Sequence, residues 1–240
     1  MEHAGRGGRL TDGAYLIRRA MSLALDAAFE SLGKGLPDRA ITLLDIGGRG
    51  RPHAALISRR LGGAGRDVRH VVIDPDPGAD AAGMAETLPL RSACVEMVLC
   101  TQVLEHVADP QQAVSEMRRV LRPGGVCLLT THGTWFYHPD PEDYWRWTSA
   151  GLARLFATCG FEEVDVRPVG GTKLAIATLG LTAIERGAGN GLAGALARRL
   201  LVAPANVLAS RALMRRVSGR TSLPGELAIN YLVTARRGRA

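Results

Sequence analysis

Glycines and acidic residues at the ends of two apolar segments form the pattern in this chain that is best suited to chemistry. Segment 43–50 (LLDIGGRG) runs from apolar residues through an acid into a glycine-rich turn, and the apolar segment 71–74 ends in the acid Asp74. Glycines let a backbone approach a ligand closely, and the helix after such a turn points its N-terminus at the ligand. A carboxylate can accept hydrogen bonds from both hydroxyls of a ribose. The pattern predicts a site for an adenosine-containing cofactor.

Other polar residues follow apolar runs farther along the chain. Thr101 and Gln102 come after segment 95–100, and His132 comes after segment 126–131. An imidazole has an ordinary pKa of about 6.5, which suits a general base for removing the proton of a hydroxyl group. His132 is therefore a candidate catalytic residue, although the same side chain could simply cap the end of a strand by hydrogen bonding.

A loop rich in aromatic residues comes next. Segment 138–148 reads HPDPEDYWRWT, and His138 and Asp143 are further candidates for the base. One interpretation is a lid that positions the acceptor. The other is an anchor, in which the aromatic side chains pack the loop onto the following helix, with Thr148 as the helix N-cap. The two interpretations are compatible.

The elements that must position these residues alternate between strand and helix. The expected strands are 41–46, 68–74, 95–100, 126–131, 161–169 and 226–236, and the expected helices are 11–32, 52–61, 110–121 and 149–159. Short connections between alternating elements predict an α/β fold with a parallel sheet and helices on both faces. Ligands of such sheets bind at the carboxyl ends of the strands, where all the candidate residues fall.

Composition limits the class of protein. The chain has 240 residues, 46% of them hydrophobic and 22% charged, which fits one globular α/β domain over 1–240 and excludes a disordered chain. The formal net charge is +7, and almost all of the basic residues are arginine. Arginine together with abundant alanine and glycine often reflects genomic base composition, so the charge by itself does not indicate a nucleic-acid partner. It does leave room for an acidic partner.

Cysteine usage and the N-terminal residues favour a cytoplasmic protein. The four cysteines, Cys94, Cys100, Cys127 and Cys159, form no C-x-x-C pair, so we expect reduced thiols and no metal site. Residues 1–13 are polar, which does not resemble a signal peptide. The longest uncharged apolar run, 174–184, is shorter than the roughly 20 residues that cross a bilayer, so no membrane span is expected.

Residues 170–225 form an insertion before the last expected strand, and residues 1–40 form an N-terminal helical segment. The insertion is rich in Ala, Leu, Gly and Arg and is expected to be helical. Its arginines among apolar residues are Arg186, Arg198, Arg199, Arg211, Arg215 and Arg216. Segment 171–216 could make a peripheral contact with a membrane or a lipid carrier. Alternatively, the insertion covers the sheet or forms a homodimer contact.

With these residues assembled, the chain resembles the class I S-adenosylmethionine-dependent methyltransferases. The motifs that carry the resemblance are the acidic glycine turn 45–50, Asp74, LPL at 88–90, VLCTQVLEHV at 98–107 and VLRPGG at 120–125. Segment 138–148 narrows it to a bacterial subgroup associated with glycan, envelope or secondary-metabolite pathways. The resemblance covers roughly 41–169 and the last strand. It implies a Rossmann-like, doubly wound sheet of seven strands, mostly parallel with an antiparallel last strand.

The resemblance also implies roles for individual residues toward S-adenosyl-L-methionine. The cofactor-binding set is Asp45, Gly47, Gly48 and Gly50 near the methionine end, Asp74 on the ribose, Met84 and Ala85 beside the adenine, and Thr101 and Gln102 near the sulfonium. Methyl transfer from a sulfonium is an in-line displacement that needs no metal. The implied acceptor is a small molecule, such as a hydroxyl of a sugar, a lipid-linked sugar or a secondary metabolite.

Two departures from the family pattern leave an alternative open. Arg49 occupies the position of the family's usual second glycine, and Met84 occupies that of its adenine-contacting acid. A protein that binds the cofactor without catalysis, in a regulatory or scaffolding role, fits these departures. A nicotinamide-dependent enzyme is disfavoured because the turn lacks G-x-G-x-x-G. A nucleic-acid methyltransferase is disfavoured because segment 98–103 lacks the Asn/Asp-Pro-Pro-aromatic run, and no RNA-binding module is evident.

Overall fold

The chain divides into two compact units. The computed structural model describes residues 10–62, 65–139, 142–189, 191–213 and 226–239, without the side chains of 212 and 213. The first unit comprises residues 26–167 with 231–240 and contains nearly all of the sheet; the second comprises residues 1–25 with 168–230. The expectation of a single domain over 1–240 stays a prediction. Parts of three expected segments (1–9, 140–141 and 214–225, which includes Arg215 and Arg216) lie outside the described residues.

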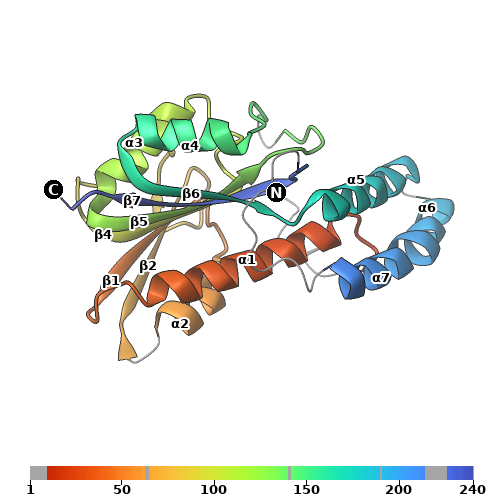
Figure 1. The fold of residues 1–240 in the computed structure, drawn as a ribbon, viewed down its shortest axis with the longest axis horizontal. Helices are drawn as coiled ribbons and strands as arrows, with labels where there is room; N and C mark the ends of the chain where they lie inside the picture. The colour runs from red at the N-terminus through yellow and green to blue at the C-terminus, as the bar shows by residue number, and fades with distance from the viewer. Residues whose placement is uncertain (1–9, 63–64, 140–141, 190, 214–225, 240) are drawn as a thin grey trace. The chain divides into compact units, whose positions relative to one another are not determined.

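A seven-stranded sheet forms the centre of the fold, in the order β3-β2-β1-β4-β5-β7-β6 (Figure 1). The strands are β1 (Ile41–Ile46), β2 (Val68–Asp74), β3 (Ala81–Ala82), β4 (Val95–Thr101), β5 (Leu121–His132), β6 (Phe161–Val169) and β7 (Asn230–Arg237). β1 pairs in parallel with β2 and β4, β2 with β3, and β4 with β5, whereas β7 is antiparallel. The predicted Rossmann-like fold with an antiparallel last strand is confirmed.

Helices cover both faces of this sheet. They are α1 (Tyr15–Gly33), whose C-terminal part lies in the first unit, α2 (Ala54–Leu61), α3 (Pro110–Val120) and α4 (Ser149–Thr158). α3 and α4 lie on one side of the sheet and α2 on the other (Figure 1). Both predicted N-caps are confirmed: Asp109 accepts a hydrogen bond from the backbone N–H of Gln112, and Thr148 accepts one from that of Gly151.

Several boundaries differ from the expectation. α2 begins at Ala54 because Pro52 and His53 lie in a turn. β5 begins at Leu121, where the backbone leaves α3 and becomes extended at once, rather than after the Pro-Gly-Gly segment. β3 was not expected, because two residues are too few to show a pattern of their own.

The core lies in the central strands. Leu43 and Leu44 of β1 and Val98 and Leu99 of β4 have no solvent-exposed area. Strands covered on both faces read as continuous apolar runs, which explains why their extents were predictable. The first polar residues after these runs therefore lie together at the carboxyl edge of the sheet.

The insertion is helical over the residues that the structure describes. Its elements are α5 (Thr172–Gly187), α6 (Leu192–Ala197), the π-turn η2 (Arg198–Val202) and α7 (Ala203–Leu213). α6, η2 and α7 follow one another without a break, and α5 packs against all three. The side-chain amide of Asn206 donates to the carbonyl oxygens of Leu10, at 2.7 Å, and Asp12, at 2.9 Å. These bonds hold α7 to the N-terminal part of the same unit.

One helix of the insertion is longer and more apolar than the sequence analysis expected. Leu192–Arg211 is a helical run of 20 residues with mean hydropathy 1.3, long and apolar enough to cross a membrane by length and composition alone. Only 17% of its most apolar stretch is buried. The sequence analysis did not single out this segment because it counted uncharged runs, which end at Arg198 and Arg199.

Candidate active site

The glycine turn after β1 is built so that two of its positions accept only glycine. Gly47 has a φ of +74°. A Cβ atom there would lie 2.4 Å from Cγ2 of Val103, and a Cβ atom on Gly48 would lie 2.2 Å from Cγ of Asp45. Gly50 also has a positive φ, of +75°, but with open space around it. The turn therefore follows the acid closely, as the sequence pattern requires of a cofactor cradle.

Asp45 is fully buried beneath this turn. Its Oδ2 lies 3.0 Å from Nε2 of His70, and its Oδ1 has no hydrogen-bond partner among the described residues. A buried carboxylate oxygen without a donor is costly, so Oδ1 suits a donor such as an amino group of a ligand. The role of His70 was missed. It follows from the β1–β2 register, in which Leu43 pairs with His70 and Asp45 lies two residues farther on the same face.

Arg49 does not turn back onto the glycines. Its Nη1 pairs with Oδ2 of Asp76 at 2.9 Å, in the turn after β2. Asp74, the last residue of β2, is nearly buried, and its Oδ1 accepts a hydrogen bond of 3.0 Å from the backbone N–H of Asp76. Arg49 thus ties the glycine turn to the turn that follows the ribose-binding candidate.

Met84 and Ala85 come just after β3, the strand that pairs with the end of β2. Asp74 is opposite Ala82 in that pairing. Met84 is half exposed, whereas Ala85 is buried. This placement agrees with an apolar surface beside Asp74, which is what an adenine ring would require.

The end of β4 carries a backbone distortion. Gln102 has a φ of +55°, a region that non-glycine residues rarely adopt and that often marks functional sites. Its backbone N–H donates to the carbonyl oxygen of Thr130, and its Nε2 donates to the Thr130 hydroxyl at 3.1 Å. Beside it, Oγ1 of Thr101 lies 3.3 Å from Nε2 of His53, whose pKa is lowered by burial.

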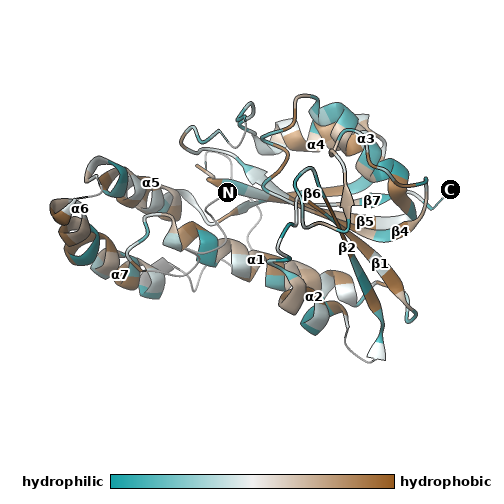
Figure 2. Cartoon of the chain, turned by 180° about the vertical axis from the view of Figure 1, so that it is seen from behind, coloured by the Kyte–Doolittle hydropathy of each residue, from teal (hydrophilic) through white to brown (hydrophobic). Residues whose placement is uncertain are grey.

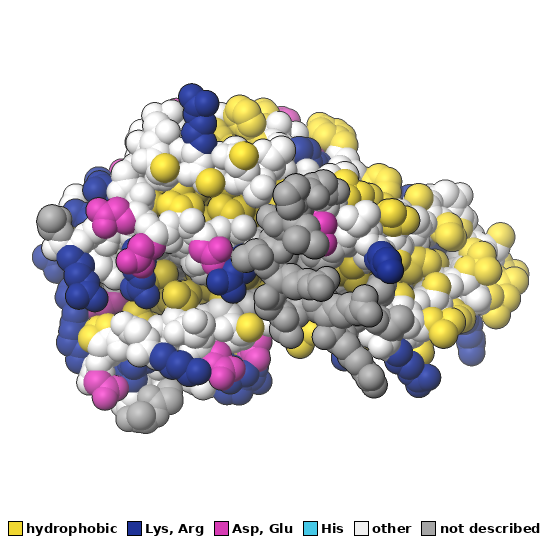
Figure 3. All heavy atoms as spheres, viewed as in Figure 1, with side chains coloured by type: hydrophobic (Ala, Val, Ile, Leu, Met, Phe, Trp, Pro, Cys, Tyr) yellow, Lys and Arg dark blue, Asp and Glu magenta, His cyan; other side chains and the backbone are white. Residues whose placement is uncertain are grey.

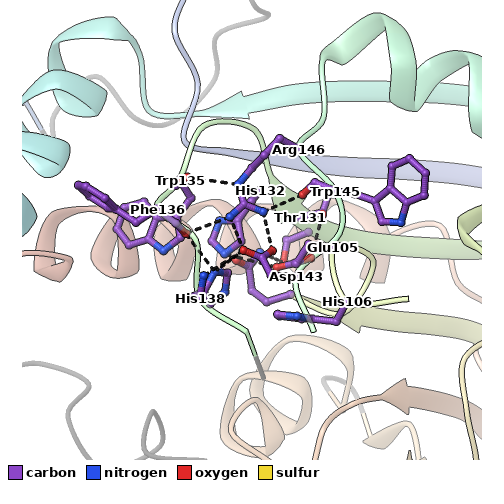
Figure 4. A network of polar contacts seen from close by, with 12 residues as sticks. Glu105, His106, Thr131, His132, Trp135, Phe136, His138, Asp143, Trp145 and Arg146 are labelled. Carbon is purple, nitrogen blue, oxygen red and sulfur yellow. Dashed lines mark hydrogen bonds and ion pairs between the residues drawn. The ribbon is translucent and has the colours of Figure 1, made fainter. Parts of the chain in front are cut away.

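A buried histidine at the end of β5 and a buried glutamate in the turn after β4 lie close together (Figure 4). Nε2 of His132 is 3.4 Å from Oε1 of Glu105, and the hydroxyl of Thr131 donates to Oε2 of Glu105 at 2.8 Å. Glu105 has no exposed area, and burial raises its pKa to about 7. The ring of His132 stacks on Trp135 with centroids 5.7 Å apart. An imidazole beside a carboxylate in a dry site can take up a proton and keep the new charge balanced.

Asp143 belongs to a second polar group in the aromatic loop (Figure 4). Arg146 binds it through both terminal nitrogens, at 2.6 and 2.5 Å, and these hydrogen bonds hold the pKa of Asp143 well below its usual range. Oδ2 of Asp143 also accepts the backbone N–H of His138 at 3.0 Å. Burial lowers the pKa of His138. Asp143 is thus a weak base that holds His138 in place.

The loop is attached to the same two strand ends. The backbone N–H groups of Tyr144 and Trp145 donate to the carbonyl oxygen of Glu105, and that of Trp147 donates to the carbonyl oxygen of His132. The indole N–H of Trp145 donates to the carbonyl oxygen of Val107 at 2.8 Å. The loop therefore fixes the backbone positions of both members of the buried pair.

Three side chains of the site also form a ligand set that a metal ion could use. Glu105, His132 and His138 each offer one ligand atom within 4.8 Å of the others. Two imidazoles and a carboxylate are common ligands of zinc and iron. The expectation of no metal site was drawn from the cysteines, because the sequence does not show that these three residues meet. Proton transfer is the other chemistry open to the same residues.

The candidate residues thus fall into two groups that share β4. The first group lies at or just after the ends of β1, β2, β3 and β4 and consists of Asp45, Gly47, Gly48, Gly50, Asp74, Met84, Ala85, Thr101 and Gln102. The second group, at the ends of β4 and β5 and in the loop, consists of His132, His138 and Asp143, together with Glu105 and Arg146. Sequence reasoning missed the catalytic potential of Glu105, although an acid three residues after Gln102 was visible.

Comparisons with known proteins agree with this geometry. Residues 44–129 match the family model described as "Methyltransferase domain". A "Probable S-adenosylmethionine-dependent methyltransferase" from Mycolicibacterium smegmatis is 40% identical over 89 residues, which cover 35% of each chain. An "Uncharacterized methyltransferase" from Mycobacterium avium is 37% identical over 114 residues, covering 41% of this chain and 42% of the relative. The matches therefore span less than half the length of these curated relatives.

Solved structures share the fold across most of the chain. The CurJ carbon methyltransferase has a TM-score of 0.59 at 15% identity. The match covers 92% of this chain and 55% of the CurJ chain. Phosphoethanolamine N-methyltransferase 2 of Haemonchus contortus, in complex with S-adenosyl-L-methionine, has a TM-score of 0.55 at 13% identity. The match covers 90% of this chain and 52% of the Haemonchus chain. Residues 44–129 therefore match a methyltransferase-domain family model, and the chain shares the fold of these methyltransferases of known structure.

Proposed function

We propose that this protein transfers the methyl group of S-adenosyl-L-methionine to a hydroxyl oxygen of a small molecule. The observation that carries the proposal is the buried His132–Glu105 pair, 3.4 Å apart at the carboxyl edge of the sheet. A hydroxyl acceptor, unlike a thiolate or a free amine, must lose a proton as it is methylated. A base next to the cofactor cradle supplies that function.

The residues of the cradle suit the cofactor. When bound, S-adenosyl-L-methionine supplies an electrophilic methyl group on a sulfonium. Asp45 offers the buried Oδ1 to its amino group, and Gly48 leaves room for the Asp45 carboxylate, which a Cβ atom at that position would displace. Asp74 offers a carboxylate to the ribose hydroxyls. Gln102 follows β4 in a strained conformation, and its side chain is held by the hydroxyl of Thr130.

His132 is the base in this mechanism, and Glu105 is the residue that supports it. The imidazole of His132 takes the proton of the acceptor hydroxyl as the oxygen attacks the methyl carbon. The carboxylate of Glu105, fixed by the hydroxyl of Thr131, balances the imidazolium that forms. Asp143 and His138 act as positioning residues, because Arg146 occupies both oxygens of Asp143.

The acceptor that we propose is a hydroxyl of a sugar or of a secondary metabolite. Trp135 is half buried against His132, and the nearby Tyr137 has 67% of its area exposed. Aromatic faces of this kind pack against the C–H face of a sugar ring or against an apolar metabolite. The cytoplasm is the proposed location, which agrees with the four free cysteines.

Transfer of a labelled methyl group from S-adenosyl-L-methionine to a panel of sugars and hydroxylated metabolites tests the function. With an accepted substrate, we expect His132→Ala to lower kcat by about 10²–10⁴-fold and to leave cofactor affinity nearly unchanged. Calorimetry of the same variant supplies the second readout. Normal turnover of the variant would exclude His132 as the base.

A second candidate function is cofactor binding without catalysis. Arg49, which binds Asp76 rather than leaving the turn to glycines alone, and the exposed Met84 favour this alternative. A chain that binds the cofactor tightly but methylates no hydroxyl in the panel, with or without added divalent metal, would support it over the proposed reaction.

A further inference from the structure

The positive charge of this protein is concentrated in one segment. Between Glu185 and Glu226 the sequence has no acidic residue and seven arginines. The remaining 23 basic residues equal the 23 acidic residues of the whole chain, so segment 186–225 accounts for the entire net charge of +7. The arginines are Arg186, Arg198, Arg199 and Arg211, which the structure describes, and Arg215, Arg216 and Arg220, which lie outside the described residues.

The same segment exposes its leucines. Leu192, Leu196, Leu200 and Leu208 have 89%, 55%, 60% and 69% of their area exposed. The first three are spaced four residues apart, which places them along one side of the helix Leu192–Arg211. Figure 2 shows the hydrophobic colour concentrated on α6. We call this side, with its neighbouring arginines, the leucine–arginine face.

The helix cannot rotate to bury these leucines, because its other side is already occupied. Val202 has no exposed area, and the side-chain amide of Asn206 is bonded to the backbone of Leu10 and Asp12. Those contacts lie within the same compact unit. The leucine–arginine face is therefore turned outward by the packing of the unit itself.

Arginines stand among the exposed leucines. Arg199 and Arg211 are exposed, and none of the described contacts pairs them with an acid. In Figure 3, the surface over α5, α6 and α7 is largely hydrophobic with scattered basic side chains. A large exposed apolar surface on a soluble chain marks a contact with a partner, and here the partner must tolerate both leucine and arginine.

We propose that the leucine–arginine face docks on an anionic lipid bilayer surface. Leucines enter the boundary between headgroups and acyl chains, while arginines stay at the anionic headgroups. A second copy of the chain fits less well, because two such faces would bring arginines against arginines with no acid from the segment between them. A nucleic acid would leave the leucines in water, since such interfaces are strongly polar.

The helix lies along the membrane surface rather than across it. Arg198 and Arg199 fall near the middle of Leu192–Arg211, where a spanning helix would place them deep in the hydrocarbon. Asn206, on the inner side, is committed to the rest of its unit. Both features suit a helix that lies in the interfacial plane.

Co-sedimentation of the full chain with lipid vesicles tests the proposal. We expect binding to vesicles of phosphatidylcholine mixed with phosphatidylglycerol, little binding to pure phosphatidylcholine, and loss of binding in high salt. Arg199→Gln with Arg211→Gln should weaken partitioning by roughly 10–30-fold, by the usual contribution of each arginine near an anionic surface. The matched control is Arg91→Gln with Arg154→Gln, which removes the same charge from exposed positions in the other unit and should change partitioning far less.

A leucine pair tests the insertion step separately. Leu192→Gln with Leu208→Gln should weaken binding to the anionic vesicles at least about tenfold, because both side chains lose their apolar contact with lipid. Leu10→Gln with Leu23→Gln, at other partly exposed leucines, is the control for surface polarity and should leave binding nearly unchanged.

Three outcomes would overturn the proposal. Equal binding to both kinds of vesicle would remove the role of lipid charge. If the Arg199/Arg211 and Leu192/Leu208 double variants both bind vesicles like the wild type, the contact lies on another face. Retention of the chain in vesicles after an alkaline carbonate wash would show a spanning helix in place of a surface contact. Circular dichroism of each variant, matching the wild type, excludes unfolding as the cause of lost binding.

Discussion

Glu105 is the residue whose environment most affects the proposed chemistry. It is fully buried after β4, and burial favours its neutral, protonated form. Its neighbours Thr131, His106 and Arg146 favour the ionised form, but their effect is smaller than that of burial. A carboxylate that ionises near neutral pH next to His132 can balance the imidazolium during proton transfer. The catalytic pair that we propose therefore includes a carboxyl group whose pKa is raised by burial to about 7.

The raised pKa of Glu105, about 7, predicts a pH dependence of activity and stability. We expect kcat to rise as pH increases through about 7, and Glu105→Gln to lower kcat and remove the contribution of Glu105 to that rise. Stability should behave oppositely. Between about pH 4.5 and 7 the unfolded chain has released a proton that folded Glu105 retains, so this group makes the fold less stable as pH rises.

The pH–rate profile and urea unfolding, each measured for wild type and Glu105→Gln, check this prediction. In the variant, the free energy of unfolding should fall less between mildly acidic and mildly alkaline pH. Identical profiles for the two proteins would show that Glu105 does not titrate in this range.

Gly48 offers a test of the cradle at a single atom. Gly48→Ala would place a methyl group 2.2 Å from Cγ of Asp45, so either the turn or the acid must move. We expect affinity for S-adenosyl-L-methionine to fall at least about tenfold, since one misplaced contact costs more than about 1.4 kcal/mol.

Gly180→Ala is the matched control for the glycine test. A Cβ atom at Gly180, within α5, meets no atom within 4 Å. This variant should leave cofactor affinity unchanged and stabilise the helix by about 0.5–1 kcal/mol. If both variants bind the cofactor like the wild type, the glycine turn is not the cofactor site.

The sequence singled out residues within one short segment more readily than residues that act in pairs. Asp74 and the glycines became candidates because a strand end and a turn lie within one short segment, and their roles stay predictions. His70, Glu105 and Arg146 could not be assigned, because their partners Asp45, His132 and Asp143 become neighbours only through strand pairing or loop folding.

At the scale of elements, loop 138–148 has the densest set of attachments near the site. Its backbone is bonded to Glu105 and His132, and its side chains form the Arg146–Asp143 pair. Both sequence interpretations of the loop, lid and anchor, had it pack near the site. The observed backbone contacts attach the loop to Glu105 and His132, whereas the anchor interpretation had its aromatic side chains pack onto the following helix. Both interpretations stay predictions.

Removing the arginine of this loop should loosen the site. Arg146→Ala leaves the buried side chain of Asp143 without its two charged donors, which we expect to cost about 2–3 kcal/mol, less than for a fully buried pair because Arg146 is partly exposed. Arg146→Lys should recover only part of the loss, because lysine cannot bind both oxygens in the same plane. Arg154→Ala, at an exposed position of α4, is the control.

Urea unfolding and turnover measured together check the prediction for the loop. We expect Arg146→Ala to lower both the unfolding midpoint and kcat, because His138 and the backbone at Glu105 lose a fixed neighbour. A variant as stable as the wild type would show that the pair contributes nothing to holding the loop.

The elements themselves were largely predictable. β1, β2 and β6 have the predicted bounds. For β1 the reason is that a buried parallel strand reads as a nearly continuous apolar run between turn residues. The start of β5 and the two-residue β3 were not predictable, since each depends on pairing with a neighbour rather than on its own pattern. The helix Leu192–Arg211 was missed as a long apolar element because two arginines interrupt its run.

At the scale of the whole molecule, charge and function are separated along the chain. The sheet unit holds both groups of candidate site residues, whereas segment 186–225, in the other unit, carries the whole net charge. The two roles that we propose, methyl transfer and lipid docking, therefore rest on different residues. Variants of Arg199 and Arg211 should leave cofactor affinity unchanged, so the two proposals can fail independently.

Calorimetric titration of the whole protein with S-adenosyl-L-methionine and S-adenosylhomocysteine, for wild type and Asp74→Ala, tests the central claim most directly. We predict micromolar binding of both ligands to the wild type. Asp74→Ala should weaken it by about 1–3 kcal/mol, because the ribose loses charge-assisted hydrogen bonds. Absence of binding to the folded wild type, or equal affinity of the variant, would contradict the assignment of the cofactor site.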